Sequence, residues 1–315
     1  MNDYRTPRRF TPSQTLFALL VGTILSGLST TVHAQLYVGD GVGRTIREYN
    51  PNTGQLINAS FITGSAGPIL ISGNLLYARD YGADSLSEYN ATTGAPISSP
   101  FLSIKGPMQP AIAGNTLFVP SLIDQNVFTP TYKNSIATFD ASTGAIINAS
   151  FITGLDAPFT VAVMGNSLYV AFRDSISKYD ATTGALINSG FITGLNEPLD
   201  FTISGNNLYV SNYGSDTVGE YDATTGAAVN ASLITGISMP TGIAVAGNNL
   251  YVSSFGNNRI GLYDATTGAA INTNFAVGIN GSLAVVVPEP GTAVLLMLGA
   301  AAFCGSRRRH GRSAD

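Results

Sequence analysis

Acidic and aromatic side chains recur in the loops of this 315-residue chain, where they could bind a ligand. Two examples are the segments Asp80-Tyr81-Gly82-Ala83-Asp84 and Tyr213-Gly214-Ser215-Asp216. Carboxylates supply the oxygen ligands that Ca²⁺ prefers, and exposed aromatic rings supply apolar faces on which sugars can stack. The candidate ligand-binding residues are Asp80, Tyr81, Asp84, Asp156, Arg173, Glu197, Tyr213, Asp216 and Phe255.

A structural interpretation of the same loop acids stays open, because Asp and Asn often cap the backbone N–H groups of their own turn. Asp200 differs from them, since it lies inside an apolar stretch and could face a central channel. There it could bind Ca²⁺ with Asp156 or Glu197, or it could simply meet water. We favour water, and Asp200 stays a candidate metal ligand.

The N-terminal segment has the pattern of a signal peptide. Arg5, Arg8 and Arg9 precede an apolar stretch from Leu16 to Leu28, and Val32-His33-Ala34 places small residues where signal peptidase cleaves. We therefore expect residues 1–34 to be removed by signal peptidase before Gln35.

The C-terminal segment, residues 288–315, has three parts in a fixed order. Pro288-Glu289-Pro290 comes first, an apolar run from Ala293 to Cys304 follows, and Arg307, Arg308 and Arg309 come last. A buried helix is a poor alternative, because three consecutive arginines have no obvious place on a soluble core. The order suits a short anchor with its cations on the cytoplasmic side.

This segment resembles the PEP-CTERM sorting tail. The resemblance implies that an exosortase recognises Pro288, Glu289 and Pro290 while the apolar run provides a transient inner-membrane anchor and the arginines fix its orientation. It also implies export, followed by delivery to the cell surface or the extracellular matrix.

The body between these segments, residues 35–287, carries eight Lys and Arg against sixteen Asp and Glu, a net charge of −8. This charge repels nucleic acid. The body contains no Cys, His or Trp, because Cys304, His33 and His310 all lie in the end segments. Disulfide scaffolds, His-bearing metal sites and Ser-His or Cys-His nucleophiles are thereby excluded. We expect no cofactor, with Ca²⁺ as the one open possibility.

Internal repeats predict the architecture of the body. A Leu-aromatic-Val or Leu-aromatic-Ala segment occurs six times, and its aromatic residue recurs after 40, 41, 51, 40 and 42 residues. The six aromatic residues are Tyr37, Tyr77, Phe118, Tyr169, Tyr209 and Tyr251. A period of about 40 residues, divided into four short strands by Gly-rich and Asn-rich turns, is typical of a β-propeller blade. The longest interval contains an insertion between Ser121 and Asn134.

The two ends of the body predict how the ring closes. Gln35 to Val38 reads as the second strand of a blade, and Ser282 to Val287 reads as an inner strand without a second strand after it. Pairing the two completes one blade and removes exposed sheet edges. We therefore expect an all-β, six-bladed β-propeller, although seven blades stay possible if one escapes detection.

The segment Leu208-Tyr209-Val210-Ser211-Asn212-Tyr213-Gly214 resembles the YVTN β-propeller repeat, whose pattern overlaps with NHL-type repeats. The resemblance implies a surface or secreted scaffold protein. In a propeller, the loops from second to third strands and the links between blades surround the channel mouth. The ligand candidates fall in these loops, whereas the Asp-Ala-Thr-Thr-Gly turns of the opposite face are nearly identical.

Two functions from different classes remain. The first is a non-enzymatic binding or structural module for an exopolysaccharide or a surface protein, and we prefer it. The alternative is a Ca²⁺-dependent hydrolase or lactonase resembling gluconolactonases, which needs oxygen ligands converging in the channel.

Overall fold

The computed structural model describes residues 34–286, with gaps at 42, 81 and 123–133. Chain contacts separate Met1–His33 from a second unit, Ala34–Asp315, which holds every described strand. The expected signal peptide (1–34, except Ala34), the sorting motif (Pro288, Glu289, Pro290) and the arginines Arg307 to Arg309 lie outside the described residues, as does Tyr81.

The described residues form 24 strands and one 3₁₀ turn, η1 (Tyr213–Ser215). The inner strands are β24 (Leu283–Val286), β4 (Ser65–Ser72), β8 (Ala111–Ala113), β12 (Val161–Met164), β16 (Pro198–Ser204) and β20 (Pro240–Ala246). The second strands are β1 (Gln35–Asp40), β5 (Leu75–Asp80), β9 (Thr116–Ser121), β13 (Ser167–Ala171), β17 (Asn207–Asn212) and β21 (Asn249–Ser254). The third strands are β2 (Thr45–Tyr49), β6 (Ser85–Asn90), β10 (Asn134–Asp140), β14 (Ser175–Asp180), β18 (Thr217–Asp222) and β22 (Arg259–Asp264). The outer strands are β3 (Leu56–Thr63), β7 (Pro96–Ser103), β11 (Ile146–Leu155), β15 (Leu186–Thr193), β19 (Ala228–Thr235) and β23 (Ala270–Val277).

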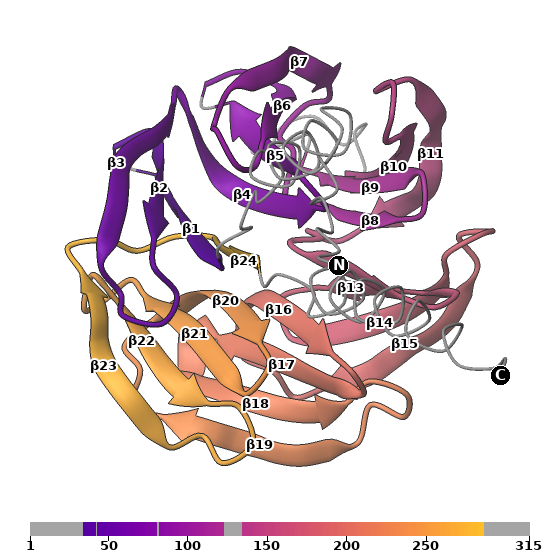
Figure 1. Cartoon of the computed structure of the whole chain (residues 1–315). Coiled ribbons are helices and arrows are strands. Elements are labelled where there is room, and N and C mark those ends of the chain that lie inside the picture. Colours follow the sequence, from indigo (N-terminus) through magenta and orange to yellow (C-terminus); the bar gives the residue numbers. More distant parts are fainter. Residues whose placement is uncertain (1–33, 42, 81, 123–133, 287–315) are drawn as a thin grey trace, which may run out of the picture. The chain divides into compact units, whose positions relative to one another are not determined.

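These strands form six antiparallel sheets of four, which are the blades of a propeller (Figure 1). We number the blades 1 to 6 from the sheet that contains β1. The prediction of an all-β protein with six blades is confirmed. The repeat of about 40 residues and its Gly and Asn turns predicted this architecture. The additional residues of the long third interval fall between β9 and β10 of one blade, and residues 123–133 among them lie outside the described part of the chain.

Blade 1 closes the ring in the predicted way. β24 pairs antiparallel with β1, from Gln35 opposite Val286 to Val38 opposite Leu283. The N–H of Gly39 extends this pairing by donating to the carbonyl of Ser282 at 3.0 Å. The innermost strand of blade 1 thus comes from the C-terminal side of the body, and its other three strands from the N-terminal side.

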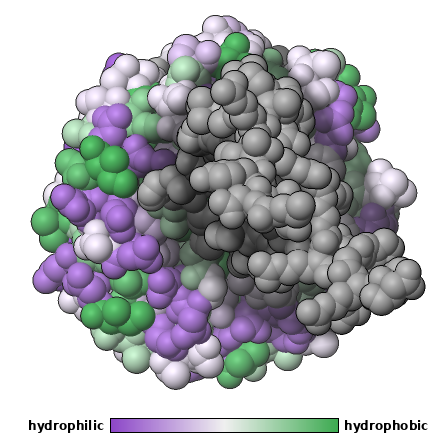
Figure 2. All heavy atoms as spheres, in the orientation of Figure 1, coloured by the Kyte–Doolittle hydropathy of each residue, from purple (hydrophilic) through white to green (hydrophobic). Residues whose placement is uncertain are grey.

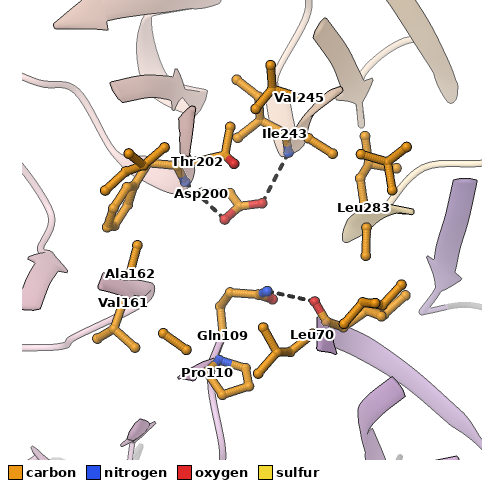
Figure 3. Close-up of a pocket in the computed structure, with 18 of the residues that line it drawn as sticks. Leu70, Gln109, Pro110, Val161, Ala162, Asp200, Thr202, Ile243, Val245 and Leu283 are labelled. Atoms are coloured by element: carbon orange, nitrogen blue, oxygen red, sulfur yellow. Dashed lines mark hydrogen bonds between the residues drawn. The ribbon is translucent and has the colours of Figure 1, made fainter. Parts of the chain in front are cut away.

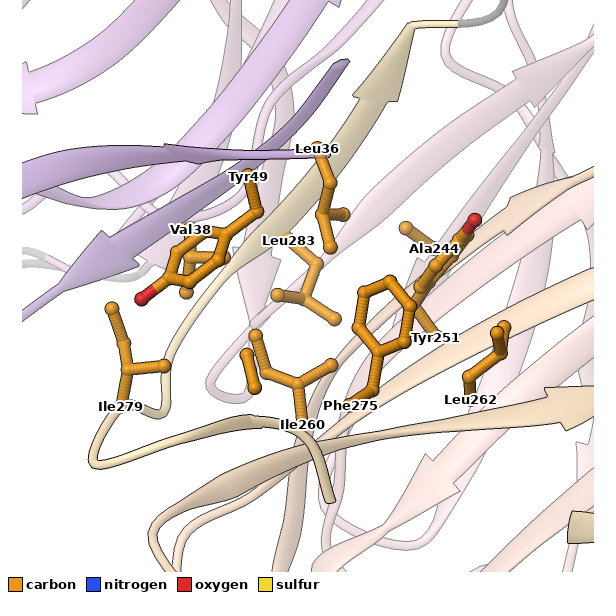
Figure 4. Close-up of a cluster of buried hydrophobic side chains, with 11 residues drawn as sticks. Leu36, Val38, Tyr49, Ala244, Tyr251, Ile260, Leu262, Phe275, Ile279 and Leu283 are labelled. Atoms are coloured by element: carbon orange, nitrogen blue, oxygen red, sulfur yellow. The ribbon is translucent and has the colours of Figure 1, made fainter. Parts of the chain in front are cut away.

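The seam, by which we mean the junction between blades 6 and 1 beside the β24–β1 closure, has the same contacts as the other junctions between blades. The hydroxyl of Tyr251 in blade 6 donates to the carbonyl of Pro51 in blade 1 at 2.7 Å, just as Tyr169 donates to Ala223 at 2.6 Å. Figure 4 shows the apolar cluster at the seam, where Leu283 packs among buried residues of both blades. Side-chain burial therefore continues around the whole ring.

Each turn from a third to an outer strand docks on the preceding blade. In blade 5, Asp222 Oδ1 accepts the N–H groups of Thr224 at 2.9 Å and Thr225 at 2.7 Å. Gly226 follows with φ of +77°, and a Cβ there would lie 2.0 Å from the carbonyl oxygen of Phe191. Only glycine meets both requirements, which explains the Thr-Gly pair of every repeat.

The outer strands expose aliphatic side chains at repeated positions, such as Ile147, Ile187 and Ile271. In the ungreyed part of the view in Figure 2, apolar residues form separate patches near the edge of the molecule rather than one continuous surface. Next to them, Asn58, Asn148 and Asn230 each accept the backbone N–H two residues on. The register shifts there, and such bulges discourage edge-to-edge pairing.

The two ends of the ring differ in character. We call one end the mouth face; it contains the loops from second to third strands and the links between blades. We call the other end the turn face; it contains the hairpins from inner to second strands and the Asp-Ala-Thr-Thr-Gly turns.

Candidate functional site

The six inner strands enclose two connected spaces along the axis. An inner cavity of about 340 Å³ is lined by residues of all six inner strands or the links that lead into them. A pocket of about 500 Å³ lies at the mouth face, where the links between blades meet. Both spaces are of the size that holds a small ligand or a few residues of a polymer.

Polar side chains form a layer where the two spaces meet. Asp200 and Gln109 line both of them, and they face each other in Figure 3. The Gln109 amide donates to the carbonyl of Ile69 at 2.8 Å, and the hydroxyl of Thr160 donates to the carbonyl of Leu199 at 2.8 Å. These bonds link neighbouring blades, because inner strands leave one edge of the backbone unpaired at the channel.

The carboxyl group of Asp200 is buried and accepts hydrogen bonds from two backbone N–H groups. Its side chain is 9% exposed; Oδ1 accepts the N–H of Phe201 at 2.9 Å and Oδ2 accepts the N–H of Ile243 at 3.1 Å (Figure 3). Asp200 thus lines both channel spaces, and its carboxyl also accepts two backbone N–H groups. Its carboxyl satisfies the unpaired edge of blade 6, a role that the sequence of one strand could not reveal.

Burial raises the pKa of Asp200 to about 7, although the two backbone N–H groups oppose this shift. The folded protein thus keeps the proton up to about pH 7, whereas the unfolded chain releases it near pH 4. This contribution to stability is complete below pH 4 and is lost as the pH rises through 7.

We expect the free energy of unfolding of the body to fall between pH 4 and pH 7 by up to about 4 kcal/mol on account of Asp200. Asp200→Asn removes this titration, although it also loses one acceptor, so its profile should be flatter. Urea denaturation of both proteins across this range measures the difference, which isolates Asp200 from other titrating groups. Parallel profiles for the two proteins would contradict the assignment.

Three of the predicted ligand residues hold the mouth loops together. Asp80 accepts hydrogen bonds from the hydroxyls of Ser65, Ser85 and Ser87 at 2.7 to 2.8 Å. Asp84 accepts the N–H of Gly106 at 3.1 Å, and Asp216 accepts the N–H of Met239 at 2.8 Å. Asp84 and Asp216 thus hold equivalent links to the next blade in place, so their carboxylates stabilise the loops of the mouth face.

Three other candidates come together between blades 4 and 5. The N–H of Glu197 donates to the carbonyl of Arg173 at 2.9 Å, and the N–H of Tyr213 donates to the carbonyl of Glu197 at 3.1 Å. Glu197 and Arg173 are exposed, and Tyr213 is half-buried. Asp156 is also exposed on the mouth face. These residues surround the mouth without lining the pocket itself.

Of the described loop candidates, Phe255 lines the mouth pocket, as does the candidate metal ligand Asp200. Its side chain is 54% exposed. Phe159, Met108 and Gln109 line the pocket as well, and sequence reasoning missed them. Met108 lies in the link before inner strand β8, and Phe159 lies in the link before inner strand β12. Glycines supply much of the remaining wall, which leaves the backbone accessible beside the aromatic rings.

No three Asp, Glu, His or Cys side chains gather closely enough to hold a metal ion in residues 34–286, leaving aside their undescribed gaps. Across the same described part of the chain, no helix is long and apolar enough to cross a membrane.

Comparison with known proteins identifies two segments of the chain. Residues 42–274 match the family model described as outer membrane protein assembly factor BamB, and residues 286–309 match the PEP-CTERM protein-sorting motif. The second match confirms the resemblance of the tail, and the first confirms a repeat-built propeller. The PEP-CTERM motif implies export, membrane-anchored sorting and processing by an exosortase. No curated protein matches the chain.

Solved structures share the fold at low sequence identity. A chain in the crystal structure of a nidogen/laminin complex aligns with a TM-score of 0.66 and 14% identity, over 81% of this chain and 99% of that one. The computationally designed Ika8 protein aligns with a TM-score of 0.50 and 14% identity, over 76% and 84% of the two chains. At this identity the likeness establishes the fold alone.

Proposed function

Since this chain belongs to the family described as outer membrane protein assembly factor BamB and ends in a PEP-CTERM motif, we propose that it is an exported binding module for extracellular polysaccharide. In this proposal the mature body spans residues 35–287, and it resides at the cell surface or in the extracellular matrix after its tail has been processed. Binding needs no metal ion or cofactor and involves no catalysis.

The mouth pocket is the observation that carries the proposal. Phe255 presents an exposed ring at its rim, and Phe159 adds a second, half-buried ring. The C–H face of a sugar ring packs well against such rings, while Gln109 and the backbone of the wall offer hydrogen-bond partners for hydroxyl groups. With a volume of about 500 Å³, the pocket is large enough for one or two sugar residues of a longer chain.

The charge of the body favours a neutral polymer or one of low charge density. The body carries a net charge of −8, and a dense polyanion would be repelled. The alternative of a Ca²⁺-dependent hydrolase is supported by no group of three ligand side chains in the described residues, so we do not propose it.

Phe255→Ala should weaken retention of the purified body on exopolysaccharide from the producing cells at least tenfold, a loss of about 1.4 kcal/mol. Retention can be measured by affinity electrophoresis, with the polysaccharide cast into the gel. Ile271→Ala is the matched control, because Ile271 is 55% exposed but lies on outer strand β23. Equal retention of the two variants would refute binding at the mouth.

A further inference from the structure

The chain enters and leaves the propeller at one point on the turn face. Gln35, the first residue of β1, pairs with Val286, the last residue of β24. In blade 5 the equivalent pair is Asn207 and Ser204, which a tight hairpin connects. In blade 1 no hairpin joins the inner and second strands, and the two ends of the described body, Gln35 and Val286, lie side by side in its place.

The distance from this point to the sorting motif is short. Only Val287 separates Val286 from Pro288, and two peptide units span about 7 Å even when fully extended. The recognition tripeptide therefore starts within about 7 Å of the end of β24. An enzyme that grips Pro288-Glu289-Pro290 must approach the hairpins around it, such as Gly205-Asn206 and Gly247-Asn248.

Peeling β24 away would give the enzyme more room, but the seam opposes it. Leu283 is 4% exposed and packs in the cluster shared by blades 6 and 1, with Val285 against the same cluster. Removing the strand also breaks its ladder with β1 and opens the ring. Burial of the two side chains alone is worth roughly 2 to 5 kcal/mol, so the closed ring is the form that the enzyme meets.

The turn face has a distinct chemistry. Its turns contain Asp140, Asp180, Asp222 and Asp264 but no Lys or Arg. The backbone N–H and hydroxyl of Thr225 lower the pKa of Asp222, and equivalent bonds from Thr183 and Thr267 lower the pKa of Asp180 and Asp264. At Asp140 the hydroxyl of Ser142 lowers the pKa most, followed by that of Thr143. All four carboxylates are therefore ionised at neutral pH. A protein that packs here needs neutral hydrogen-bond donors or basic side chains.

We propose that the exosortase processes this chain as a folded propeller and packs against its turn face around the end of β24. The mouth face then points away from the enzyme and the membrane, so the binding pocket stays free before the tail is released. The inference depends on exosortase processing and is independent of which ligand the mouth binds.

Site-specific photo-crosslinking in the producing cells tests this contact. We compare a photoreactive residue at Asn206, exposed in a hairpin of the turn face, with one at Ser215, exposed in η1 on the mouth face. Both positions lie in blade 5, and each substitution gives up one or two side-chain hydrogen bonds. We expect at least ten times more adduct with the exosortase from Asn206 than from Ser215.

A flexible Gly-Ser spacer between Val287 and Pro288 provides the second arm. If the turn face contacts the enzyme only because the motif lies so close, a spacer several times longer than this gap should lower the Asn206 adduct to the Ser215 level. Equal adducts from the two positions, no adduct from Asn206, or an adduct unaffected by the spacer would each overturn the proposal. Failure of polysaccharide binding would leave these results unchanged, so the two proposals are tested separately.

Discussion

We expect a body that lacks Leu283 to Val287 to lose cooperative folding, while a body ending at Val287 folds normally. The deletion exposes the edge of β1 and removes Leu283 from the core of the seam. It also removes the backbone hydrogen bonds of a four-residue ladder. Together these losses approach the 5 to 15 kcal/mol by which a typical domain is stable. Thermal denaturation followed by circular dichroism measures the result.

A milder substitution keeps this prediction testable if the deleted protein cannot be purified. Leu283→Ala should lower the free energy of unfolding by about 2 to 5 kcal/mol, as a buried Leu-to-Ala change does. Ile243→Ala in β20 is the matched control, because Ile243 is 3% exposed at the equivalent position of blade 6. Similar losses for both variants show a closed seam. A loss near zero for Leu283→Ala alone would mean that β24 is dispensable.

The architecture could be predicted from the sequence because each of the six repeats shows the same pattern of strands and turns. The strand predicted from Gln35 to Val38 is observed as β1 (Gln35–Asp40), and the one predicted from Ser282 to Val287 is observed as β24 (Leu283–Val286), so the bounds differ by at most two residues. Closure by β24 was also predicted from the sequence, since the body begins with a second strand that lacks an inner strand and ends with an inner strand that lacks a second strand. Because the pattern is repeated six times, an error in assigning the strands of one repeat would be exposed by the other five.

The site was harder to predict, because it depends on contacts between blades. Asp200 was predicted to face the channel, but the sequence could not show that it accepts the N–H of Ile243, which is 43 residues away. Asp84 and Asp216 read as ligands or local caps, whereas each holds the link that leads to the following blade. Phe159 was not among the predicted residues, since nothing in the local sequence distinguishes a residue of the pocket wall from one of a buried strand. Among the described candidates, Phe255 and Asp200 were predicted and line the mouth pocket.

Replacing Pro288-Glu289-Pro290 by three alanines should leave export unaffected and block processing of the tail almost completely. We propose that the exosortase recognises this tripeptide, because the PEP-CTERM motif implies processing by that enzyme, and the replacement leaves the apolar run and the three arginines unchanged. The variant should therefore be held in the inner membrane by its apolar run. Ser313→Ala, beyond the arginines, is the matched control and should be processed like the wild type.

The location and mass of this variant in the producing cells test the central claim, an exported propeller sorted through its tail, most directly. Fractionation followed by mass spectrometry should find the wild type and Ser313→Ala outside the inner membrane with the tail removed. The triple-alanine variant should be found in the inner membrane, without its signal peptide but with the tail intact. If this variant appears outside the inner membrane at the wild-type mass, the motif does not direct sorting, and the account is wrong.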